Sequence, residues 1–293
     1  MLDLTCGGAG HTRALLRVLQ PKTVVAFDRD ARALTAARER LKDAPCEVIF
    51  VHAPFSEMHR ELDAIGISHV DAILADLGVS SHQIDTGERG FSFRSNGPLD
   101  MRMGQDGPSA ADIVNTIDEK LLARIIALYG EERKARAIAR AIGRVRGDIE
   151  ISRTLELADI VSQSIGQPPG LQKIHPATRT FQALRIYVND ELGELVRGLA
   201  SAENLLGDGG RLAVVTFHSL EDRIAKKFLA RRTGRVGRPS RHLPETQPPA
   251  PSFTELTRKG VQASEDEISI NPRSRSARLR AATRTGASAF PWE

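Results

Sequence analysis

The stretch Asp3-Leu4-Thr5-Cys6-Gly7-Gly8-Ala9-Gly10-His11 joins a short apolar run to a helical pattern. Small residues at such a junction let the backbone approach a ligand closely, and the following helix offers amide groups without intrahelical partners. The next apolar run, residues 24–27, ends at Asp28, where an acid in a nucleotide-type α/β fold accepts hydrogen bonds from ribose hydroxyls. The stretch therefore predicts an α/β fold with a nucleotide-type ligand at its first strand-to-helix turn.

The same stretch favours S-adenosylmethionine over a dinucleotide. A dinucleotide fingerprint requires G-x-G-x-x-G, and Arg13 stands where the third glycine belongs. Asp3 would repel a pyrophosphate but could hold a cation. S-adenosylmethionine suits this pattern because it has a ribose, a cationic amino-acid tail and no phosphate. An ordinary tight turn without a ligand is the alternative.

A second candidate segment follows the apolar run 70–75 and is Asp76-Leu77-Gly78-Val79-Ser80-Ser81-His82-Gln83. Ligands of open α/β sheets bind at the carboxyl ends of the strands, so we expect Asp76 in the same crevice as Gly10 and Asp28. There its carboxylate would accept a hydrogen bond from an exocyclic amine and orient the amine nitrogen toward a methyl donor. The alternative is a structural aspartate that caps a helix or a turn.

Strand and helix patterns alternate at both ends of the chain and predict a parallel sheet with helices on both faces. Residues 105–173 show helical spacing alone, so we expect a helical insertion between two parts of one domain, residues 1–104 and 174–293. The apolar runs that predict strands lie at residues 2–4, 24–27, 48–51, 70–75 and 211–217.

Local patterns in the last third of the chain carry further predictions. The apolar residues from Phe181 to Leu195 are spaced by three or four positions, which predicts one long helix. The glycine-rich residues 207–210 predict a turn, and the proline-rich residues 239–251 predict an exposed loop.

The composition excludes several protein classes. Among 293 residues, 41% are hydrophobic and 27% are charged, values typical of a globular protein rather than of a disordered chain or a rod. No window reaches about 18 consecutive apolar residues, and the first five residues lack the basic region of a secretory signal. Two cysteines, Cys6 and Cys46, suit a reducing cytosol and predict neither a disulfide framework nor a metal site. We therefore expect a cytoplasmic protein.

Positive charge is concentrated late in the chain. Residues 231–284 hold 12 Lys/Arg and 5 Asp/Glu, whereas residues 1–230 hold 29 and 31. Localised positive charge favours a polyanionic partner, because binding releases condensed counterions. The acid-free run 271–284 is expected to form a basic surface for that partner, with the helical insertion as the opposing wall of the groove. The alternatives are a solvated or disordered basic tail and a segment that packs on the protein's own sheet. The basic residues predicted for this surface are Lys226, Lys227, Arg231, Arg232, Arg273, Arg275 and Arg278.

A loop at residues 89–94 combines Phe91 and Phe93 with Arg89 and Arg94. Two phenylalanines beside two arginines suit a flipped base, which stacks on the rings while the arginines neutralise its phosphates. Packing of the two rings on a satellite of the core is the alternative.

The segment Phe217-His218-Ser219-Leu220-Glu221-Asp222-Arg223 follows the last predicted strand. Ser219 and Asp222 predict a helix cap. No G-x-S-x-G elbow accompanies His218, so hydrolase chemistry is not expected here.

Together these segments resemble the small-subunit ribosomal RNA (cytosine-N4) methyltransferase family. The resemblance is carried, in order along the chain, by residues 76–81, 88–93, 97–103, 110–112, 129–132, 175–185, 189–195, 217–223 and 271–277. It implies transfer of a methyl group from S-adenosyl-L-methionine to a decoding-region cytosine of 16S-type RNA, either naked or in an assembling subunit. The implied fold is α/β, a Rossmann-like class I methyltransferase sheet with an inserted all-helical domain.

The resemblance also implies functional positions. Contacts to the cofactor fall on Ala9, Gly10, His11, Asp28, Phe55, Asp76 and Gln83. Ala9 stands where the family usually has glycine, and His82 stands where it usually has proline. Members of the family also carry a helix and most of the first strand before the position of Leu2, so we expect this chain to be shortened there.

Three other functions fit parts of the sequence. A non-catalytic RNA-binding or assembly factor would share the fold without turnover. A Rossmann oxidoreductase is disfavoured by Arg13 and by the acidic Asp3. A DNA amino-methyltransferase would carry a D/N/S-P-P-[YFW] string where this chain has Asp76-Leu77-Gly78-Val79.

Overall fold

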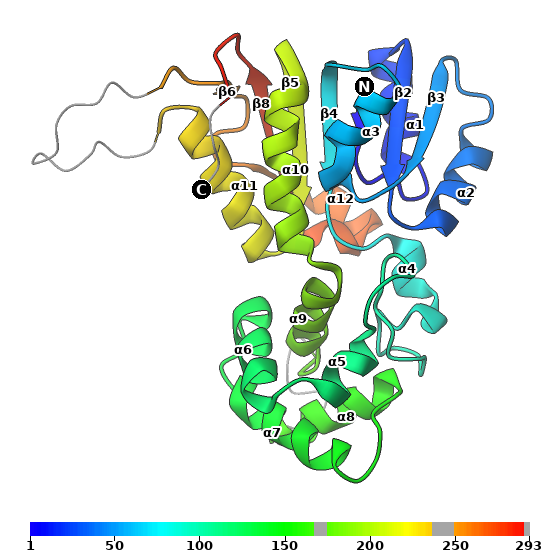
Figure 1. Cartoon of the computed structure of the whole chain (residues 1–293), viewed down its shortest axis with the longest axis vertical. Helices are drawn as coiled ribbons and strands as arrows, with labels where there is room; N and C mark the ends of the chain where they lie inside the picture. The colour runs from blue at the N-terminus through cyan, green and yellow to red at the C-terminus, as the bar shows by residue number, and fades with distance from the viewer. Residues whose placement is uncertain (167–174, 236–248, 290–293) are drawn as a thin grey trace, which may run out of the picture. The chain divides into compact units, whose positions relative to one another are not determined.

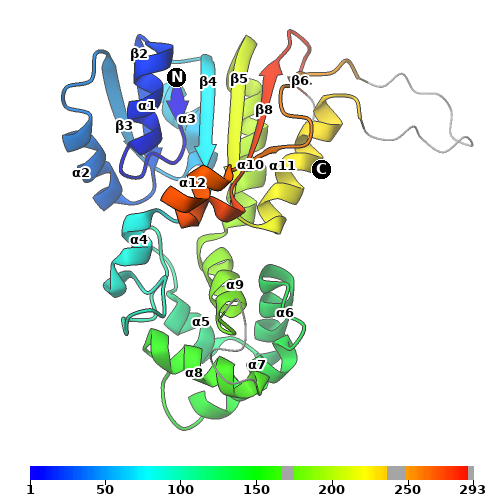
Figure 2. The same ribbon diagram turned by 180° about the vertical axis from the view of Figure 1, so that it is seen from behind.

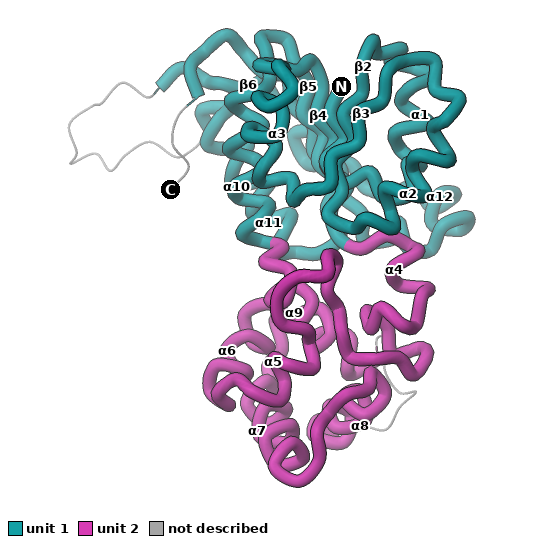
Figure 3. The backbone as a smooth tube through the Cα atoms, turned by 45° about the vertical axis from the view of Figure 1, so that its right-hand side comes forward, with its two compact units in different colours: residues 1–78, 192–293 teal, residues 79–191 magenta. Residues whose placement is uncertain are grey.

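The computed structural model describes residues 1–166, 175–235 and 249–289. Two compact units result: unit 1 comprises Met1–Gly78 and Leu192–Glu293, and unit 2 comprises Val79–Glu191 (Figure 3). The predicted loop at residues 239–251 lies, up to residue 248, outside the described residues.

Unit 1 is built on an eight-stranded sheet in the order β3-β2-β1-β4-β5-β8-β6, with β7 paired to β8 (Figures 1 and 2). Its parallel strands are β1 (Leu2–Asp3), β2 (Thr23–Asp28), β3 (Glu47–His52), β4 (Val70–Asp76) and β5 (Leu206–Thr216). The strands of its antiparallel part are β6 (Phe253–Glu255), β7 (Val261–Gln262) and β8 (Arg278–Arg284). The predicted α/β fold is confirmed, and the antiparallel part is an addition that the sequence patterns do not predict.

Helices cover both faces of this sheet because its central strands are apolar on both sides. Val24 and Ala26 of β2 belong to one core cluster, and Val25 and Phe27, which alternate with them, belong to the other. The first cluster includes residues of α1 (Gly10–Leu19) and α2 (Ala31–Arg40). The second includes residues of α3 (Met58–Ala64), α10 (Glu191–Leu205) and α11 (Ser219–Arg232).

The strand order reverses between β1 and β4, which are neighbours in the sheet although they are distant in sequence. After the short β1, the chain continues between β4 and β2. The Leu4 amide donates to the Leu74 carbonyl of β4 (2.9 Å), and the Cys6 amide donates to the Phe27 carbonyl of β2 (2.9 Å). Open α/β sheets bind ligands outside the carboxyl ends of the strands at such a reversal. The fold therefore places the candidate site where β1 and β4 end.

The predicted long helix from Phe181 to Leu195 is two helices. α9 (Thr178–Asn189) ends at Asp190, whose φ of 48° is left-handed, and α10 begins at the next residue. The apolar spacing continues across the break, so periodicity alone does not reveal it. The break lies next to the boundary between the two units.

The glycine-rich residues 207–210 are part of β5 and not a turn. β5 begins at Leu206, directly after the last residue of α10. Its register with β4 shifts between Val70 and Ala72, so the glycines lie in an irregular part of the strand pair.

Two of the three arginines of β8, Arg280 and Arg284, are buried. Arg280 is 3% exposed and donates to both carboxylate oxygens of Asp222, from Nε at 2.7 Å and from Nη2 at 3.0 Å. Arg284 donates to the backbone carbonyl oxygens of Glu203 (2.8 Å) and Ser252 (3.0 Å). For residues 278–284, the structure therefore agrees with packing on the protein's own sheet.

Unit 2 is helical and has its own apolar core. Its helices are α4 (Ser81–Asp85), α5 (Ala110–Thr116), α6 (Glu119–Gly130), α7 (Ala135–Arg146), α8 (Thr154–Ile165) and α9. The unit contains the described part of the predicted insertion 105–173 and extends beyond it at both ends. The physical reason is that Leu99 and Met101 on one side, and Phe181 and Leu184 of α9 on the other, belong to the same core.

Candidate functional site

The loop between β1 and α1 leaves backbone groups accessible. Gly7 (φ 51°) and Ala9 (φ 59°) are left-handed, and α1 begins at Gly10 without a side-chain cap. A Cβ atom built at Gly10 would meet nothing within 4 Å. The loop thus leaves open space before a helix N-terminus, whose amides attract negatively charged groups.

Ala9 occupies a conformation that favours glycine, since a left-handed backbone costs other residues roughly 1–2 kcal/mol. Ala9 is fully buried and belongs to the cluster that contains Leu16, Val24 and Ala26. Its methyl group therefore packs into the core of unit 1, and the glycines of the loop, Gly7, Gly8 and Gly10, remain accessible.

Asp3 is a structural residue. It is 1% exposed, its Oδ2 accepts a hydrogen bond from the Thr12 hydroxyl (2.5 Å), and its Oδ1 accepts one from the Thr5 amide (3.2 Å). Burial raises the pKa of Asp3 to about 6. This carboxyl group connects the end of β1 to α1, and the expectation that Asp3 could hold a cation stays a prediction.

Asp28 ends β2 and supports the same loop. Its Oδ2 accepts a hydrogen bond from the Gly7 amide (2.8 Å), and its Oδ1 accepts one from the Asp30 amide (2.8 Å). Burial raises the pKa of Asp28, and the two amides act in the opposite direction. Each carboxylate oxygen retains the capacity to accept a further hydrogen bond, such as one from a ribose hydroxyl.

Asp76 ends β4 and lies beside His11 of α1. The Asp76 amide donates to the Thr5 hydroxyl (2.7 Å), and Asp76 Oδ2 lies 3.2 Å from His11 Nδ1. This hydrogen bond to Asp76 raises the pKa of His11. Asp76 Oδ1 is buried and has no hydrogen-bond partner among the residues that the structure describes. Because a buried oxygen without a partner is costly, the arrangement suits a ligand that donates a hydrogen bond at this point.

Phe55, in the short helical turn Phe55–Glu57, packs against α10. A Cβ atom at Gly198 would lie 2.4 Å from Phe55 Cε2, so the glycine makes room for the ring. Phe55 is partly buried in the core of unit 1, and Gly198 fixes its position.

The other predicted contact residues belong to unit 2. Gln83 is 5% exposed in α4, where its Oε1 accepts a hydrogen bond from the Ser80 amide (3.0 Å) in a capping box. Phe91 and Phe93 are partly buried against the core of unit 2, and Phe93 lies edge-on to Phe181 with ring centroids 4.8 Å apart. This packing agrees with the alternative of a satellite core. Arg94 is exposed.

The residues of the predicted basic surface differ in their exposure, and one of them is buried. Arg232 is fully buried, because its Nε donates to Glu203 Oε2 (2.9 Å), so its assignment to a surface is wrong. Arg278 is 35% exposed, and its Nη1 lies 3.6 Å from Asp222 Oδ2. The exposed members are Lys226, Lys227, Arg273 and Arg275, and Arg231 is partly exposed.

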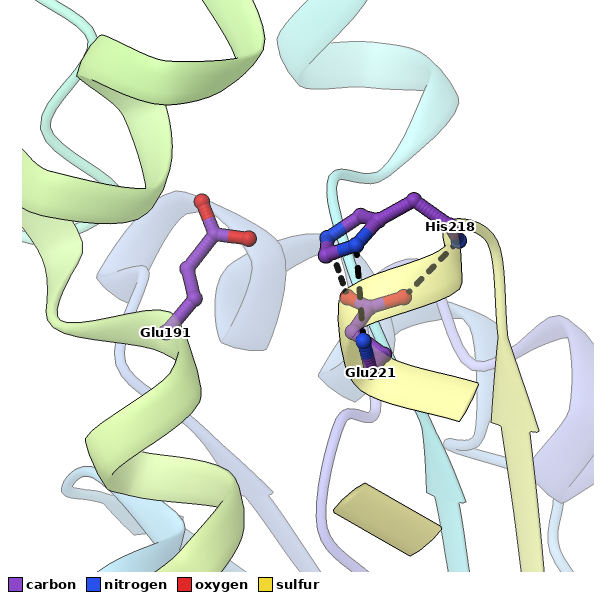
Figure 4. Close-up of side chains that lie close together, drawn as sticks. All are labelled: Glu191, His218 and Glu221. Atoms are coloured by element: carbon purple, nitrogen blue, oxygen red, sulfur yellow. Dashed lines mark hydrogen bonds and ion pairs between the residues drawn. The ribbon is translucent and has the colours of Figure 1, made fainter. Parts of the chain in front are cut away.

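His218 is an N-cap residue. Its Nδ1 accepts a long hydrogen bond from the Glu221 amide (3.5 Å), and the Glu221 carboxylate accepts one from the His218 amide (3.2 Å) (Figure 4). The same carboxylate accepts a hydrogen bond from the Phe217 amide (2.8 Å). The cap of α11 is therefore His218 with Glu221, in place of the predicted Ser219 and Asp222. Glu191, the third side chain in Figure 4, accepts hydrogen bonds from the Arg185 guanidinium (2.8 and 2.9 Å).

Sequence reasoning misses the two threonines of the first loop and helix. Thr5 accepts the hydrogen bond from the Asp76 amide and thereby connects the ends of β1 and β4. Thr12, which is fully buried, satisfies Asp3. The sequence offers one sign of this role: both threonines lie close in sequence to Asp3, an acid in a buried strand. A buried acid of this kind needs hydrogen-bond donors nearby.

The comparisons with known proteins agree on one family. The model of the MraW methylase family matches residues 1–285. The chain is 56% identical over 290 residues to a protein of Parvibaculum lavamentivorans named ribosomal RNA small subunit methyltransferase H, covering 99% of this chain and 85% of the relative. It is 50% identical over 290 residues to a protein of the same name from Azorhizobium caulinodans, covering 99% and 83%.

Solved structures give more distant similarities. A putative rRNA methylase from Clostridium thermocellum has a TM-score of 0.41 and 13% identity, covering 97% of this chain and 87% of that one. An rRNA methylase from Streptococcus thermophilus has a TM-score of 0.42 and 12% identity, covering 97% and 85%.

Proposed function

Because the chain belongs to the MraW methylase family, we propose that it transfers a methyl group from S-adenosyl-L-methionine to the exocyclic N4 of a cytosine in the decoding region of small-subunit ribosomal RNA. The family and the names of the relatives support the enzyme class and the RNA substrate. The observation that carries the chemistry is the buried Oδ1 of Asp76, which has no partner among the described residues and lies where β4 ends.

The loop before α1 and Asp28 would hold the cofactor. When bound, S-adenosyl-L-methionine supplies a methyl group that its sulfonium activates. Asp28 suits the ribose, because its oxygens can each accept one more hydrogen bond beyond those from Gly7 and Asp30. The open space at Gly10 leaves the first amides of α1 for the carboxylate of the amino-acid part.

Asp76 would position the cytosine amine. The lone pair of this amine is delocalised into the ring, so the amine is a weak nucleophile. A hydrogen bond from the amine to Asp76 Oδ1 directs the nitrogen and satisfies the buried oxygen at the same time. Orientation of this kind can supply most of the catalysis when the methyl donor is already activated.

His11 would hold the Asp76 carboxylate in that orientation. The Nδ1 of His11 lies 3.2 Å from Asp76 Oδ2, and the Thr5 hydroxyl accepts from the Asp76 amide. These contacts fix the residue from two sides and leave Oδ1 for the substrate.

The partner is small-subunit ribosomal RNA, naked or in an assembling subunit, and the place of action is the cytoplasm. The names of the relatives support the RNA. Within the described residues, no helix is both long and apolar enough to cross a membrane.

The proposal is tested with radiolabelled cofactor and small-subunit RNA from cells that lack this protein. We expect label in one cytosine, identified as N4-methylcytosine by mass spectrometry. RNA binding without any label would instead indicate a non-catalytic assembly factor.

The first prediction concerns cofactor affinity. Asp28→Ala removes the proposed acceptor of the ribose hydroxyls, so binding of S-adenosyl-L-methionine should weaken by about 1.5–3 kcal/mol, the range for hydrogen bonds to charged groups. Calorimetric titration measures the change. Asp43→Ala, at an exposed acid of the same unit, is the control and should bind as the unaltered protein does. An unchanged dissociation constant in folded Asp28→Ala protein would remove Asp28 from the site.

The second prediction concerns the pKa of His11. The hydrogen bond to Asp76 raises it above the ordinary 6.5, so the charged pair is complete below 6.5 and its contribution to stability is lost as the pH rises through the raised value. In Asp76→Asn, the pKa should fall toward 6.5. An NMR titration, with the His11 signal assigned from a His11→Gln sample, measures both values. Equal pKa values in the two proteins would show that the pair does not form.

A further inference from the structure

A row of arginines on α7 remains outside the site described above. α7 runs from Ala135 to Arg146 in unit 2, where it contacts α6 and α8 (Figure 1). Residues 133–147 contain six basic residues and no acid. The six are Arg133, Lys134, Arg136, Arg140, Arg144 and Arg146.

Two of these six side chains have structural roles. Lys134 Nζ donates to the Ile165 carbonyl at the end of α8 (2.8 Å), and Arg146 Nη1 donates to the Val114 carbonyl of α5 (2.8 Å). The other four are exposed, and no described residue offers any of them an acidic partner. These four are Arg133, Arg136, Arg140 and Arg144.

The exposed arginines form one row. Arg136, Arg140 and Arg144 follow each other at four-residue intervals, which places them on one side of the helix over a length of about 12 Å. The opposite side carries Ile138 and Ile142, which are fully buried in the core of unit 2. The apolar side therefore accounts for the position of α7, and the arginines are not needed for it.

The row is unfavourable for an isolated helix. Like charges four residues apart repel each other, and no acid among the described residues pairs with them. The Arg140 Nε donates to the Arg136 carbonyl (3.4 Å), and the Glu119 carboxylate lies against Gly143 of the same helix without forming an ion pair with any of the four arginines. A partner with regularly spaced negative charges would remove this repulsion, and the phosphates of RNA have that character.

We propose that Arg133, Arg136, Arg140 and Arg144 of unit 2 form a phosphate-binding surface for the ribosomal RNA substrate. The surface adds to the proposed function, on which it rests, by assigning RNA contacts to the helical unit. Phosphate contacts position RNA without recognising its sequence, so this surface increases affinity and leaves the choice of the methylated base to the site at Asp76.

The test is the double variant Arg136→Gln/Arg140→Gln, which keeps helix-forming residues at exposed positions. Binding to small-subunit RNA is measured by fluorescence anisotropy at several salt concentrations. We expect affinity to fall about ten-fold or more, and the slope of log affinity against log salt to decrease by roughly 1.4–1.8, which is 0.7–0.9 for each lost contact. The charge-preserving variant Arg136→Lys/Arg140→Lys should retain most of the affinity and most of the salt dependence of the unaltered protein.

The matched control is Arg17→Gln/Lys22→Gln, which removes two exposed charges from unit 1. It should bind RNA and S-adenosyl-L-methionine as the unaltered protein does. Equal losses in the two glutamine variants, or no loss in either, would overturn the proposal. Binding of the unaltered protein to anionic phospholipid vesicles, abolished by Arg136→Gln/Arg140→Gln while RNA binding persists, would assign the row to a lipid surface instead.

Failure of the proposed function would be observed in a different experiment, the methylation assay. If the unaltered protein does not methylate small-subunit RNA, the methyltransferase proposal fails, whereas the anisotropy measurements still decide whether the α7 row binds phosphates.

Discussion

Asp76→Asn is expected to lower the rate of methyl transfer by about a hundred-fold, the lower end of the usual loss for a positioned polar group in catalysis. Asparagine keeps the shape of the side chain but replaces one acceptor oxygen by a donor NH₂ group. If this group takes the buried position of Oδ1, it opposes the donor hydrogen of the cytosine amine. If it takes the position of Oδ2, it opposes His11 Nδ1 when that nitrogen is protonated. Either arrangement removes the charge that the amine and His11 share.

Single-turnover methylation of small-subunit RNA at saturating cofactor measures this loss. Asp71→Asn is the matched control, because Asp71 lies on the same strand, β4, and is exposed. A native rate for Asp76→Asn would reduce Asp76 to a structural role or to a contact with the cofactor alone.

Arg232→Met is expected to lower the free energy of unfolding by about 3–5 kcal/mol, because it leaves a buried charge without its partner. Arg232 is fully buried, and its Nε donates to Glu203, whose other oxygen accepts from the Ser252 hydroxyl (2.5 Å). The guanidinium also lies over the Phe228 ring, 4.4 Å from its centroid. Removing the arginine therefore affects the connection between α10, α11 and the segment before β6.

Urea denaturation followed by circular dichroism measures this change. Lys227→Met, at an exposed position of the same helix, should stay within about 0.5 kcal/mol of the unaltered protein. Glu203→Leu combined with Arg232→Met should recover part of the loss, since it removes the unpaired charge. A loss below about 1 kcal/mol for Arg232→Met alone would show that water reaches Glu203.

The parallel part of the fold could be predicted because its signals are local. Buried strands such as residues 24–27 are short apolar runs, and each is followed by a helical pattern. β8 could not be found in this way, since Arg280 and Arg284 occupy buried positions where a strand pattern has apolar residues. Their burial depends on Asp222 and on backbone carbonyls that are distant in sequence. The break at Asp190 was missed for a related reason, as one left-handed residue does not disturb the apolar spacing.

In the candidate site too, some residues could be predicted from local patterns and others could not. Asp28 and Asp76 could be placed at strand ends because both directly follow apolar runs. Asp3 also ends a strand, β1, yet it is buried against Thr12, and the sequence contains no separate sign of that. Whether an acid at a strand end faces solvent or the adjacent helix depends on the side chains around it, and these are known only once the chain has folded.

The division of unit 1 into residues 1–78 and 192–293 has a consequence for synthesis on the ribosome. Translation produces β1 to β4 first, then the whole of unit 2, and β5 and β8 only afterwards. Until β5 emerges, the inner edge of β4 has no neighbouring strand, and unpaired edges of this kind promote aggregation. The contiguous, helical unit 2 forms local contacts and folds early, whereas the sheet depends on pairings across more than a hundred residues, such as Asp76 with Val215. The interval between β4 and β5 is therefore the stage of synthesis at which we expect the nascent chain to aggregate most readily.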